Sequence, residues 1–378
     1  MRVYLDNAAT TRLDAEVAEA MKETMDRVYG NPSSVHAFGR EARTVIDRAR
    51  KMLAEILGTS PAELFFTSGG TEANNLVLRK SISDLGVTRI ITSPVEHHAV
   101  LHTAEELAHE GKARLDLVRL DETGKVDFSH LHELLKQDGK TLVSLMHANN
   151  EVGTKLDIEQ AAAICKEHGA FFHSDAVQTM GHYAFNLSSL PLHFTNCAAH
   201  KFHGPKGVGF CYIKSDVRLQ PMITGGAQER NMRAGTENIY GIVGLAKAME
   251  IAARDMEKES AYIRGLKNYM IAGLKESIPG VEFNGDISDD SLYTVLNVLF
   301  PETPDSDMLL FKLDIEGVAA SGGSACSSGS NVGSHVIKAL RGTTTRPAIR
   351  FSFSKYNTRA ELDYTLDLLK KIMVPQTV

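Results

Sequence analysis

Short apolar runs alternate with amphipathic stretches between about residues 60 and 215. The runs have the length of buried strands, and the stretches between them carry apolar residues at helical spacing. Such alternation predicts an α/β fold, in which a mostly parallel sheet is covered by helices on both faces. We expect strands at 64–68, 89–93, 141–147, 171–175 and 207–213, and helices at 39–57, 98–109, 129–136 and 158–168.

The alternation loosens after a long helical stretch at 239–278, whose middle part, 253–262, is highly charged. Beyond it, strands at 281–285, 294–300 and 349–353 and a closing helix at 358–372 predict a smaller α+β domain. We therefore expect a large domain over 15–255 and a small domain formed by 1–14 and 256–378.

The composition is that of a globular protein: of 378 residues, 43% are hydrophobic and 23% are charged, and the formal net charge is −6. Because no basic block is visible, a broad nucleic-acid surface is not expected. No apolar run reaches the ~18–20 residues of a membrane-spanning helix, so no membrane association is expected. The N-terminal residues lack an apolar signal region, and four isolated cysteines without a CxxC pair favour a reducing cytoplasm.

A glycine turn between a strand and a helix is the first candidate site. In TSGGTEANN (67–75), Gly69 and Gly70 allow close backbone approach, and Thr71 offers a hydroxyl at a helix N-terminus. Free N–H groups and the helix dipole there favour a phosphate. An ordinary strand-to-helix turn is the alternative interpretation.

Two charged residues follow apolar strands. Asp175, in SDAVQ, lies where α/β sheets place functional groups. Lys201, in AAHKFHGPKG, is a candidate for a Schiff base, because burial lowers the pKa of a lysine and frees its amine. The alternatives are a helix N-cap for Asp175 and a surface lysine for Lys201. The glycine-rich turn after Lys201 lacks the spacing of a P-loop.

Cys326 lies in SGGSACSSGSNVGS (321–334), whose composition is typical of a mobile loop. A cysteine there suits a reactive thiol, although an accidental surface cysteine is the alternative. Cys165, Cys197 and Cys211 occur in helical or strand patterns and are expected to be small buried hydrophobes. His98 and His102 have helical spacing, but no metal motif accompanies them, so no metal site is expected.

Taken together, these motifs resemble the NifS/IscS-type cysteine desulfurases of the fold-type I, class V aminotransferase superfamily. The resemblance spans almost the whole chain, and the joint order and spacing of the motifs make it specific. The motifs are YLDNAATT (4–11), GNPSSVHAFG (30–39), TSGGTEANN, VEHHAV (95–100), HANNEVG (147–153), SDAVQ, AHKFHGPKG, RAGTEN (233–238), GSACSSGS (323–330) and IRFSF (349–353).

The resemblance implies a pyridoxal 5'-phosphate (PLP)-dependent transferase fold of type I, with PLP held by Lys201. It also implies a role for each matching residue. Asp175 should pair with the pyridine nitrogen, Gln178 should bond the phenolic oxygen, and His97 should stack on the ring and assist proton transfer. The phosphate should be held by Gly70, Thr71 and His200, and Thr236 should reach the phosphate of the partner subunit's cofactor. The substrate carboxylate should be bound by Asn150 and Arg350.

The implied reaction converts L-cysteine to L-alanine and leaves a persulfide on Cys326, which could also serve transiently as an iron–sulfur ligand. A homodimer with shared active sites is expected, together with a sulfur acceptor such as an iron–sulfur scaffold or a tRNA-thiolation relay. The alternatives are a selenocysteine lyase, an aminotransferase, which has no use for a mobile thiol, and a non-catalytic binding subunit.

The chain departs from the family pattern in two places. Ala198 stands where many members have a serine that donates to the phosphate, so one contact should be lost and only the backbone of Ala198 should contribute. The sequence ends at PQTV soon after the last helix, whereas better-known members have a longer tail that helps to dock the scaffold. The long Gly/Ser loop resembles that of members whose cysteine can swing.

Overall fold

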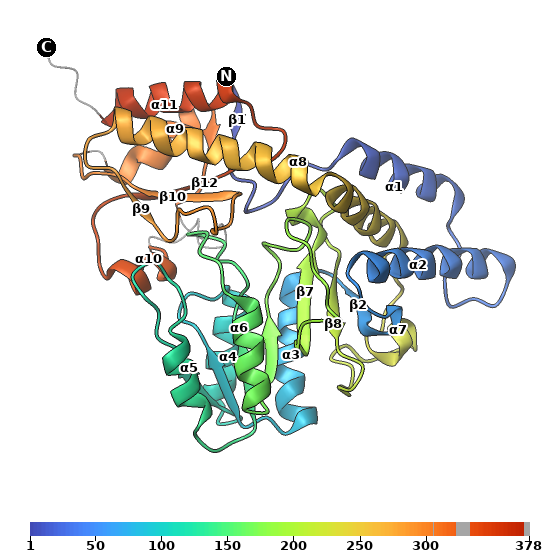
Figure 1. The fold of residues 1–378 in the computed structure, drawn as a ribbon. Helices are drawn as coiled ribbons and strands as arrows, with labels where there is room; N and C mark the ends of the chain where they lie inside the picture. The colour runs from blue at the N-terminus through green and yellow to red at the C-terminus, as the bar shows by residue number, and fades with distance from the viewer. Residues whose placement is uncertain (305, 323–332, 374–378) are drawn as a thin grey trace, which may run out of the picture.

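A seven-stranded sheet forms the centre of the larger part of the molecule (Figure 1). The computed structural model describes residues 1–304, 306–322 and 333–373. In spatial order, the strands are β2 (Leu64–Thr67), β8 (Gly209–Ile213), β7 (Phe194–Ala198), β6 (Phe171–Ser174), β5 (Thr141–Ser144), β3 (Arg89–Thr92) and β4 (Arg114–Leu117). β8 runs antiparallel to both of its neighbours, and the other pairs are parallel, which confirms the predicted mostly parallel sheet.

Helices cover both faces of this sheet, because its strands are apolar on both sides. Ile90 and Leu142 face one core with the helices α3 (Gly70–Leu85) and α4 (His98–His109). Their neighbours Ile91 and Val143 face the opposite core. The helices of that second core include α2 (Ala37–Ile56), α5 (Phe128–Leu135), α6 (Ile158–Glu167) and the first half of α8 (Ile239–Ser277). This two-residue alternation is the period of a strand buried on both faces.

The helix α8 runs from the larger part of the molecule into the smaller one (Figure 1). Its residues up to Ala252 belong to the core beneath the large sheet, whereas those from Ile263 onward belong to a separate core. The charged stretch lies between them, as expected. The N-terminal residues Val3 and Leu5 also join the second core. The division into a large domain over 15–255 and a small domain formed by 1–14 and 256–378 stays a prediction, with which these two cores are compatible.

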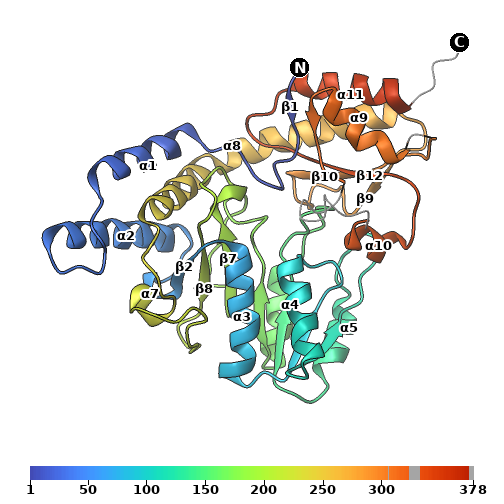
Figure 2. The ribbon, with the colours of Figure 1, turned by 180° about the vertical axis from the view of Figure 1, so that it is seen from behind.

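The smaller part contains an antiparallel sheet with the order β12 (Ala348–Ser352), β10 (Val295–Leu299) and β9 (Glu282–Asn284). A second, parallel pair joins β1 (Val3–Tyr4) to β11 (Val318–Ala319). The remaining helices are α1 (Ala15–Arg27), α7 (Gln228–Asn231), α9 (Leu309–Ile315), α10 (His335–Arg341) and α11 (Arg359–Met373). Figure 2 shows α11 and α9 beside the end of α8, on the far side of the small sheets from the large domain.

The predicted elements are present with small shifts at their ends; β5, for example, ends at Ser144 instead of residue 147. The sequence predicted an apolar strand before Lys201 without its bounds, and it did not predict β4. The strand before Lys201 is β7, whose buried polar residues Thr195 and Asn196 interrupt the apolar run, so its start could not be located. β4 lies at the sheet edge, where half-exposed polar positions are tolerated. Among the described helices, none is long and apolar enough to cross a bilayer.

Candidate active site

A cavity of about 240 Å³ opens at the carboxyl ends of β5, β6 and β7. Functional groups gather at this edge of α/β sheets because the loops that follow parallel strands meet there. The small domain closes the cavity from the other side with a residue of β12. The lining residues are Ala8, Ala9, Gly70, Thr71, Asn74, His97, Met146, Asn150, Asp175, Val177, Gln178, Ala198, His200, Lys201 and Arg350.

Asp175 directly follows β6 and is almost fully buried. One carboxylate oxygen accepts a hydrogen bond of 2.7 Å from Asn74 Nδ2, and the other accepts one of 3.0 Å from the backbone N–H of Val177. Asn74 in turn accepts a hydrogen bond from Asn196 Nδ2, and Asn196 Oδ1 accepts one from the N–H of Ala176 at 3.2 Å. The carboxylate therefore has a fixed orientation at the wall of the cavity.

Lys201 ends the short 3₁₀ helix η2 (Ala199–Lys201), which follows β7. Its Nζ donates to the carbonyl oxygens of Ala8 at 2.6 Å and Ala9 at 2.9 Å. The backbone of this turn is held by the N-terminal segment as well, because the N–H of Thr11 donates to the carbonyl of His200 at 2.9 Å. The amine of Lys201 is thus presented to the cavity from a turn that the distant N-terminal segment stabilises.

His97 is the N-cap of α4, and its Nδ1 accepts a hydrogen bond of 3.1 Å from the N–H of Ala99. The acceptor role of Nδ1 places the proton of the neutral ring on Nε2. Burial lowers the pKa of His97, and the positive charge of Lys201 lowers it further, while Asp175 opposes both effects. His97 is therefore a neutral imidazole that can donate a proton only from Nε2.

The glycine turn at the start of α3 also lines the cavity. Gly69 is the N-cap of α3 with φ of 151°, a conformation that favours glycine, and it offers no side-chain cap to the first N–H groups. A Cβ on Gly70 would come within 2.5 Å of Cγ2 of Val177. His200 lies nearby, and burial lowers its pKa to about 4, so it is neutral near pH 7. The helix N-terminus therefore provides the main attraction for an anion.

Arg350 brings a positive charge into the cavity from β12. One terminal nitrogen donates to the carboxylate of Asp6 at 2.8 Å, and the other donates to the carbonyl of Asn150 at 2.9 Å. Its Nε is buried and has no hydrogen-bond partner within the described structure. The guanidinium is thus held in one orientation and keeps donors for a carboxylate. Gln178, another lining residue, donates from Nε2 to the carbonyl of Ala8 at 3.1 Å.

Two predicted site residues are not in this cavity. Thr236 is exposed and lines a separate hollow of about 160 Å³ with Ser68, Gly207 and Gly235. Cys326 lies outside the described residues. All the other predicted residues, from Gly70 to Arg350, line the one cavity. Ala198 lies in its wall at the end of β7, where its methyl group offers no hydrogen bond.

Two buried polar residues at or beside the site, Asn74 and Glu96, were not among the candidates predicted from the sequence. Asn74 was part of the quoted glycine motif, and its position four residues after Gly70 places both on one face of α3. Glu96, beside His97, is fully buried, and burial raises its pKa to about 8. Its Oε1 accepts hydrogen bonds from Ser93 Oγ at 2.8 Å and from the N–H of Met146 at 3.0 Å. No sequence signal separates such a buried carboxyl from a surface one.

The cysteines of the described part are buried, as expected from their sequence patterns. Cys165, Cys197 and Cys211 are all fully shielded from solvent. Burial raises the pKa of Cys165 to about 12 and raises the pKa values of Cys197 and Cys211 as well. Such thiols stay protonated near pH 7 and are poor nucleophiles.

Comparison with known proteins places the chain in a family. Residues 3–365 match the aminotransferase class-V family. Cysteine desulfurase IscS of Dictyoglomus turgidum is 44% identical over 98% of this chain and 94% of its own length, and a putative cysteine desulfurase of Bacillus subtilis is 40% identical over 98% and 99%.

Solved structures agree with these relatives. A NifS-like protein, 39% identical, superposes with a TM-score of 0.91 over 98% of this chain and 99% of its own. The apo structure of a cysteine desulfurase from Thermococcus onnurineus, 26% identical, gives a TM-score of 0.87 over 98% and 94%. The chain therefore belongs to the class-V aminotransferase family and, within it, to the cysteine desulfurases of the NifS/IscS type.

Proposed function

We propose that this chain is a PLP-dependent cysteine desulfurase, which converts L-cysteine to L-alanine and leaves the sulfur as a persulfide on Cys326. The observation that carries the proposal is the convergence of Lys201, Asp175 and Arg350 in one cavity from three distant segments of the chain. Many relatives similar over nearly the whole chain are themselves named cysteine desulfurase.

The cavity fits the chemistry of PLP. A lysine amine suits the aldehyde, a fixed carboxylate suits a protonated ring nitrogen, and an uncapped helix N-terminus suits the phosphate. Lys201, Asp175 and the Gly70–Thr71 turn supply these groups. When bound, PLP supplies an electron-accepting ring that stabilises the negative charge left on the substrate's Cα. Gln178, His97 and His200 complete the proposed contacts, and Ala198 contributes none from its side chain.

The residues around the cofactor would have separate roles in binding the substrate and in moving its protons. Arg350 and Asn150 would bind the carboxylate of L-cysteine, since the guanidinium is already oriented by Asp6. The amine of Lys201, once displaced by the substrate's amine, would move the Cα proton. His97, neutral and protonated on Nε2, would donate a proton from that nitrogen beside it.

The sulfur would leave by nucleophilic attack. The thiolate of Cys326 attacks the sulfur of the substrate, a sulfur–sulfur bond forms, and the Cβ–S bond breaks. The electron pair of that bond stays with carbon, which takes up a proton and becomes the methyl group of alanine. Cys326 is preferred because the other three thiols are buried and protonated.

The test is incubation of the holoenzyme with L-cysteine, followed by mass spectrometry of the intact chain and of its peptides. We expect a gain of one sulfur atom on the peptide that contains Cys326, together with alanine in solution. Cys326→Ser should keep the PLP absorbance and bind L-cysteine, but it should form no alanine. Alanine release by Cys326→Ser at the wild-type rate would refute the persulfide role.

Selenocysteine should be assayed with the same two proteins, because a selenocysteine lyase can release selenium without attack by Cys326. Loss of cysteine activity with retained selenocysteine activity in Cys326→Ser supports the desulfurase and makes Cys326 specific to sulfur. A wild-type protein that turns over selenocysteine but not cysteine would favour the lyase.

The same proposal includes a homodimer in which Thr236 contacts the phosphate at the partner's site. Thr236 is exposed, and the adjoining N–H of Gly235 donates to Gln228 at 3.1 Å. Gln228 in turn reaches Ser33, which precedes the apolar residues Val35 and Phe38. These are 89% and 52% exposed, and Tyr29, beside Phe38, is 70% exposed. A second copy would bury this apolar patch next to Thr236.

The acceptor of the persulfide sulfur is proposed to be a carrier protein such as an iron–sulfur scaffold, in a reducing cytoplasm. The free state of the described cysteines is compatible with such a compartment.

A further inference from the structure

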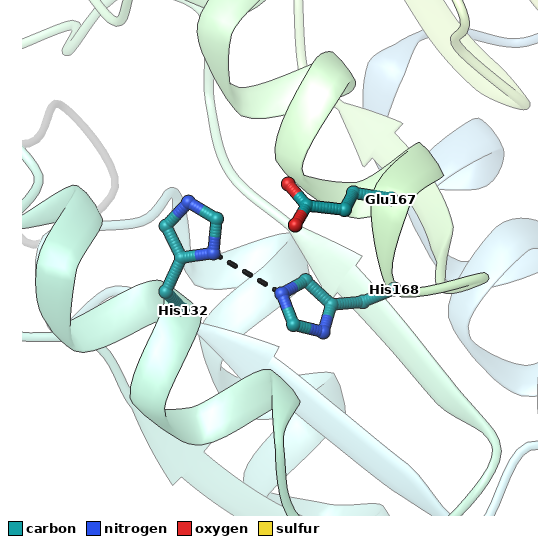
Figure 3. Close-up of side chains that lie close together, drawn as sticks. All are labelled: His132, Glu167 and His168. Carbon is teal, nitrogen blue, oxygen red and sulfur yellow. Dashed lines mark hydrogen bonds between the residues drawn. The ribbon is translucent and has the colours of Figure 1, made fainter.

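Two histidines and a glutamate lie close together on neighbouring helices (Figure 3). His132 comes from α5, while Glu167 and His168 come from the last residue and the C-cap of α6. Their ligand atoms all lie within 4.8 Å of one another. The three residues come from sequence positions that no metal motif connects, so the sequence offered no signal of the cluster.

The position of the cluster separates it from the catalytic chemistry. The helix α6 leads into the start of β6 at Phe171, whereas Asp175 and the active-site cavity follow the end of that strand. The cluster therefore lies at the amino edge of the sheet and the cavity at the carboxyl edge.

The geometry of the two imidazoles suits a tetrahedral metal ion. Nδ1 of His132 and Nε2 of His168 are 3.1 Å apart and share a single proton in the hydrogen bond that Figure 3 shows. Two nitrogens bound to one Zn²⁺ at ~2.0–2.1 Å with tetrahedral angles are separated by roughly 3.3 Å. An ion could thus replace the shared proton with only a small adjustment of the side chains.

The surrounding charges favour a cation. His132 lies in the last turn of α5, and Glu167 ends α6, so both face the partial negative charge of a helix C-terminus. Within the described part of the chain, the carboxylate of Glu167 has neither an ion pair nor a hydrogen bond. Both histidines are only half-buried, so an ion can reach them from solvent.

We propose that His132, Glu167 and His168 bind one Zn²⁺ ion that clamps α5 to α6 and leaves a fourth coordination position for water. Two histidines and one carboxylate form an established ligand set for zinc. Because the two helices approach each other only over a small contact, the ion would stabilise the folded large domain. The proposal is independent of the sulfur-transfer function.

The test is a titration of the metal-free holoenzyme with Zn²⁺ in competition with a chromogenic chelator. Every protein should carry Cys326→Ser, because a thiol is itself a zinc ligand. The pH should be about 7.5, above the usual histidine pKa of about 6.5, since only neutral imidazoles bind. We expect one equivalent of zinc per chain, and its loss in His132→Gln and in His168→Gln.

His109→Gln is the matched control, because His109 is an exposed histidine at the C-terminal end of α4 and belongs to no described cluster. It should keep the bound equivalent, and its melting temperature should rise with Zn²⁺ as that of the parent does. His132→Gln and His168→Gln should melt like the parent without metal but show no rise with it. Retention of PLP shows that a variant is folded. If one of the two glutamine variants does not retain PLP, the result is taken from the other.

Two results would overturn the proposal. The first is the absence of any tightly bound equivalent in the parent, which would leave a plain hydrogen bond between two helices. The second is an equivalent that both glutamine variants retain, which would place the zinc elsewhere. A weaker affinity in Glu167→Gln, with the stoichiometry retained, supports a carboxylate ligand.

Discussion

Burial sets the protonation state of the groups around the active-site cavity. It lowers the pKa of His97 and brings that of His200 to about 4, so both imidazoles are neutral near pH 7. It also raises the pKa of Glu96 to about 8, so this carboxyl is protonated there. The negative charge of Asp175 is thus not paired with a charged imidazole, and it can be directed at a protonated ring nitrogen.

Glu96 should make the stability of the protein depend on pH. Its pKa is about 8 in the folded chain and 4.5 as the ordinary value, so the folded state holds an additional proton between these two values. Stability from this group is therefore lost as the pH rises through that window. The glutamine of Glu96→Gln cannot ionise. The free energy of unfolding of this variant should therefore rise relative to that of wild type by up to about 1.4 kcal/mol per pH unit between about pH 5 and 8.

The measurement is chemical denaturation of both proteins across that range. The other titrating groups are common to both proteins, so their contributions cancel in the difference. Parallel stability profiles for the two proteins would show that Glu96 does not titrate in this window.

Lys201 should be the residue that carries the cofactor. Borohydride reduction of the holoenzyme should trap PLP on the peptide that contains Lys201, and Lys201→Ala should abolish turnover, because the anchor and the proton carrier are both lost. Lys206→Ala is the matched control, since Lys206 is exposed and does not line the cavity. Label on Lys206 instead of Lys201 would refute the assignment.

At the scale of elements, α3 and β7 together orient the carboxylate that follows β6. Asn74 on α3 donates to Asp175, and Asn196 on β7 donates to Asn74. Both amides are buried, and each occupies the space between two elements. They act as positioning residues, since neither would need to touch the substrate.

Asn74→Ala should therefore weaken the binding of PLP. A hydrogen bond to a charged group contributes about 1.5–3 kcal/mol, which corresponds to roughly a tenfold to hundredfold loss of affinity. Asn75→Ala is the control, because Asn75 does not line the cavity; its Nδ2 donates to the carbonyl of Thr71 within α3, and its Oδ1 accepts from Arg79 Nε. Affinity is measured by titrating the apoprotein with PLP and following its absorbance. Equal losses of PLP affinity in the two variants would indicate that both substitutions act by perturbing α3 as a whole.

Much of this arrangement could be predicted from the sequence, because apolar runs ended at residues with unusual chemistry. Asp175 and Lys201 each follow such a run, and the structure brings them into one cavity. The hydrogen bonds that link Asp175 to Asn74 and Asn74 to Asn196 could not be predicted. An asparagine at the surface and one between buried elements look the same in the sequence. The bounds of β7, the strand before Lys201, could not be predicted for the same reason, because Asn196 interrupts its apolar pattern.

At the scale of the whole molecule, the active site joins parts that belong to different cores. Arg350 comes from β12 and the carbonyls of Ala8 and Ala9 from the N-terminal segment, while Asp175 and Lys201 come from the large sheet. Asp6 and Asn150 tie Arg350 to both parts. The helix α8 runs through both cores, so the two halves of the site are held by one continuous element.

A dimer with shared sites makes a prediction about mixed subunits. A Lys201→Ala chain and a Thr236→Ala chain are each impaired alone, but in a hybrid dimer the site with an intact Lys201 receives Thr236 from its partner. The other site carries both changes. With random mixing, half of the dimers are hybrids with one intact site, so activity should reach about a quarter of the wild-type value.

The matched control replaces Thr236→Ala by Thr71→Ala. Thr71 lines the same cavity as Lys201 of its own chain, so no hybrid of Lys201→Ala with Thr71→Ala contains an intact site. Activity is followed as alanine release after mixing, and hybrid formation as native mass spectra of chains with different tags. If hybrids form and the pair with Thr236→Ala is no more active than the pair with Thr71→Ala, Thr236 does not serve the partner's site. A chain that stays monomeric at assay concentration would exclude the shared site altogether, and the exposed patch of Tyr29, Val35 and Phe38 would then require another occupant.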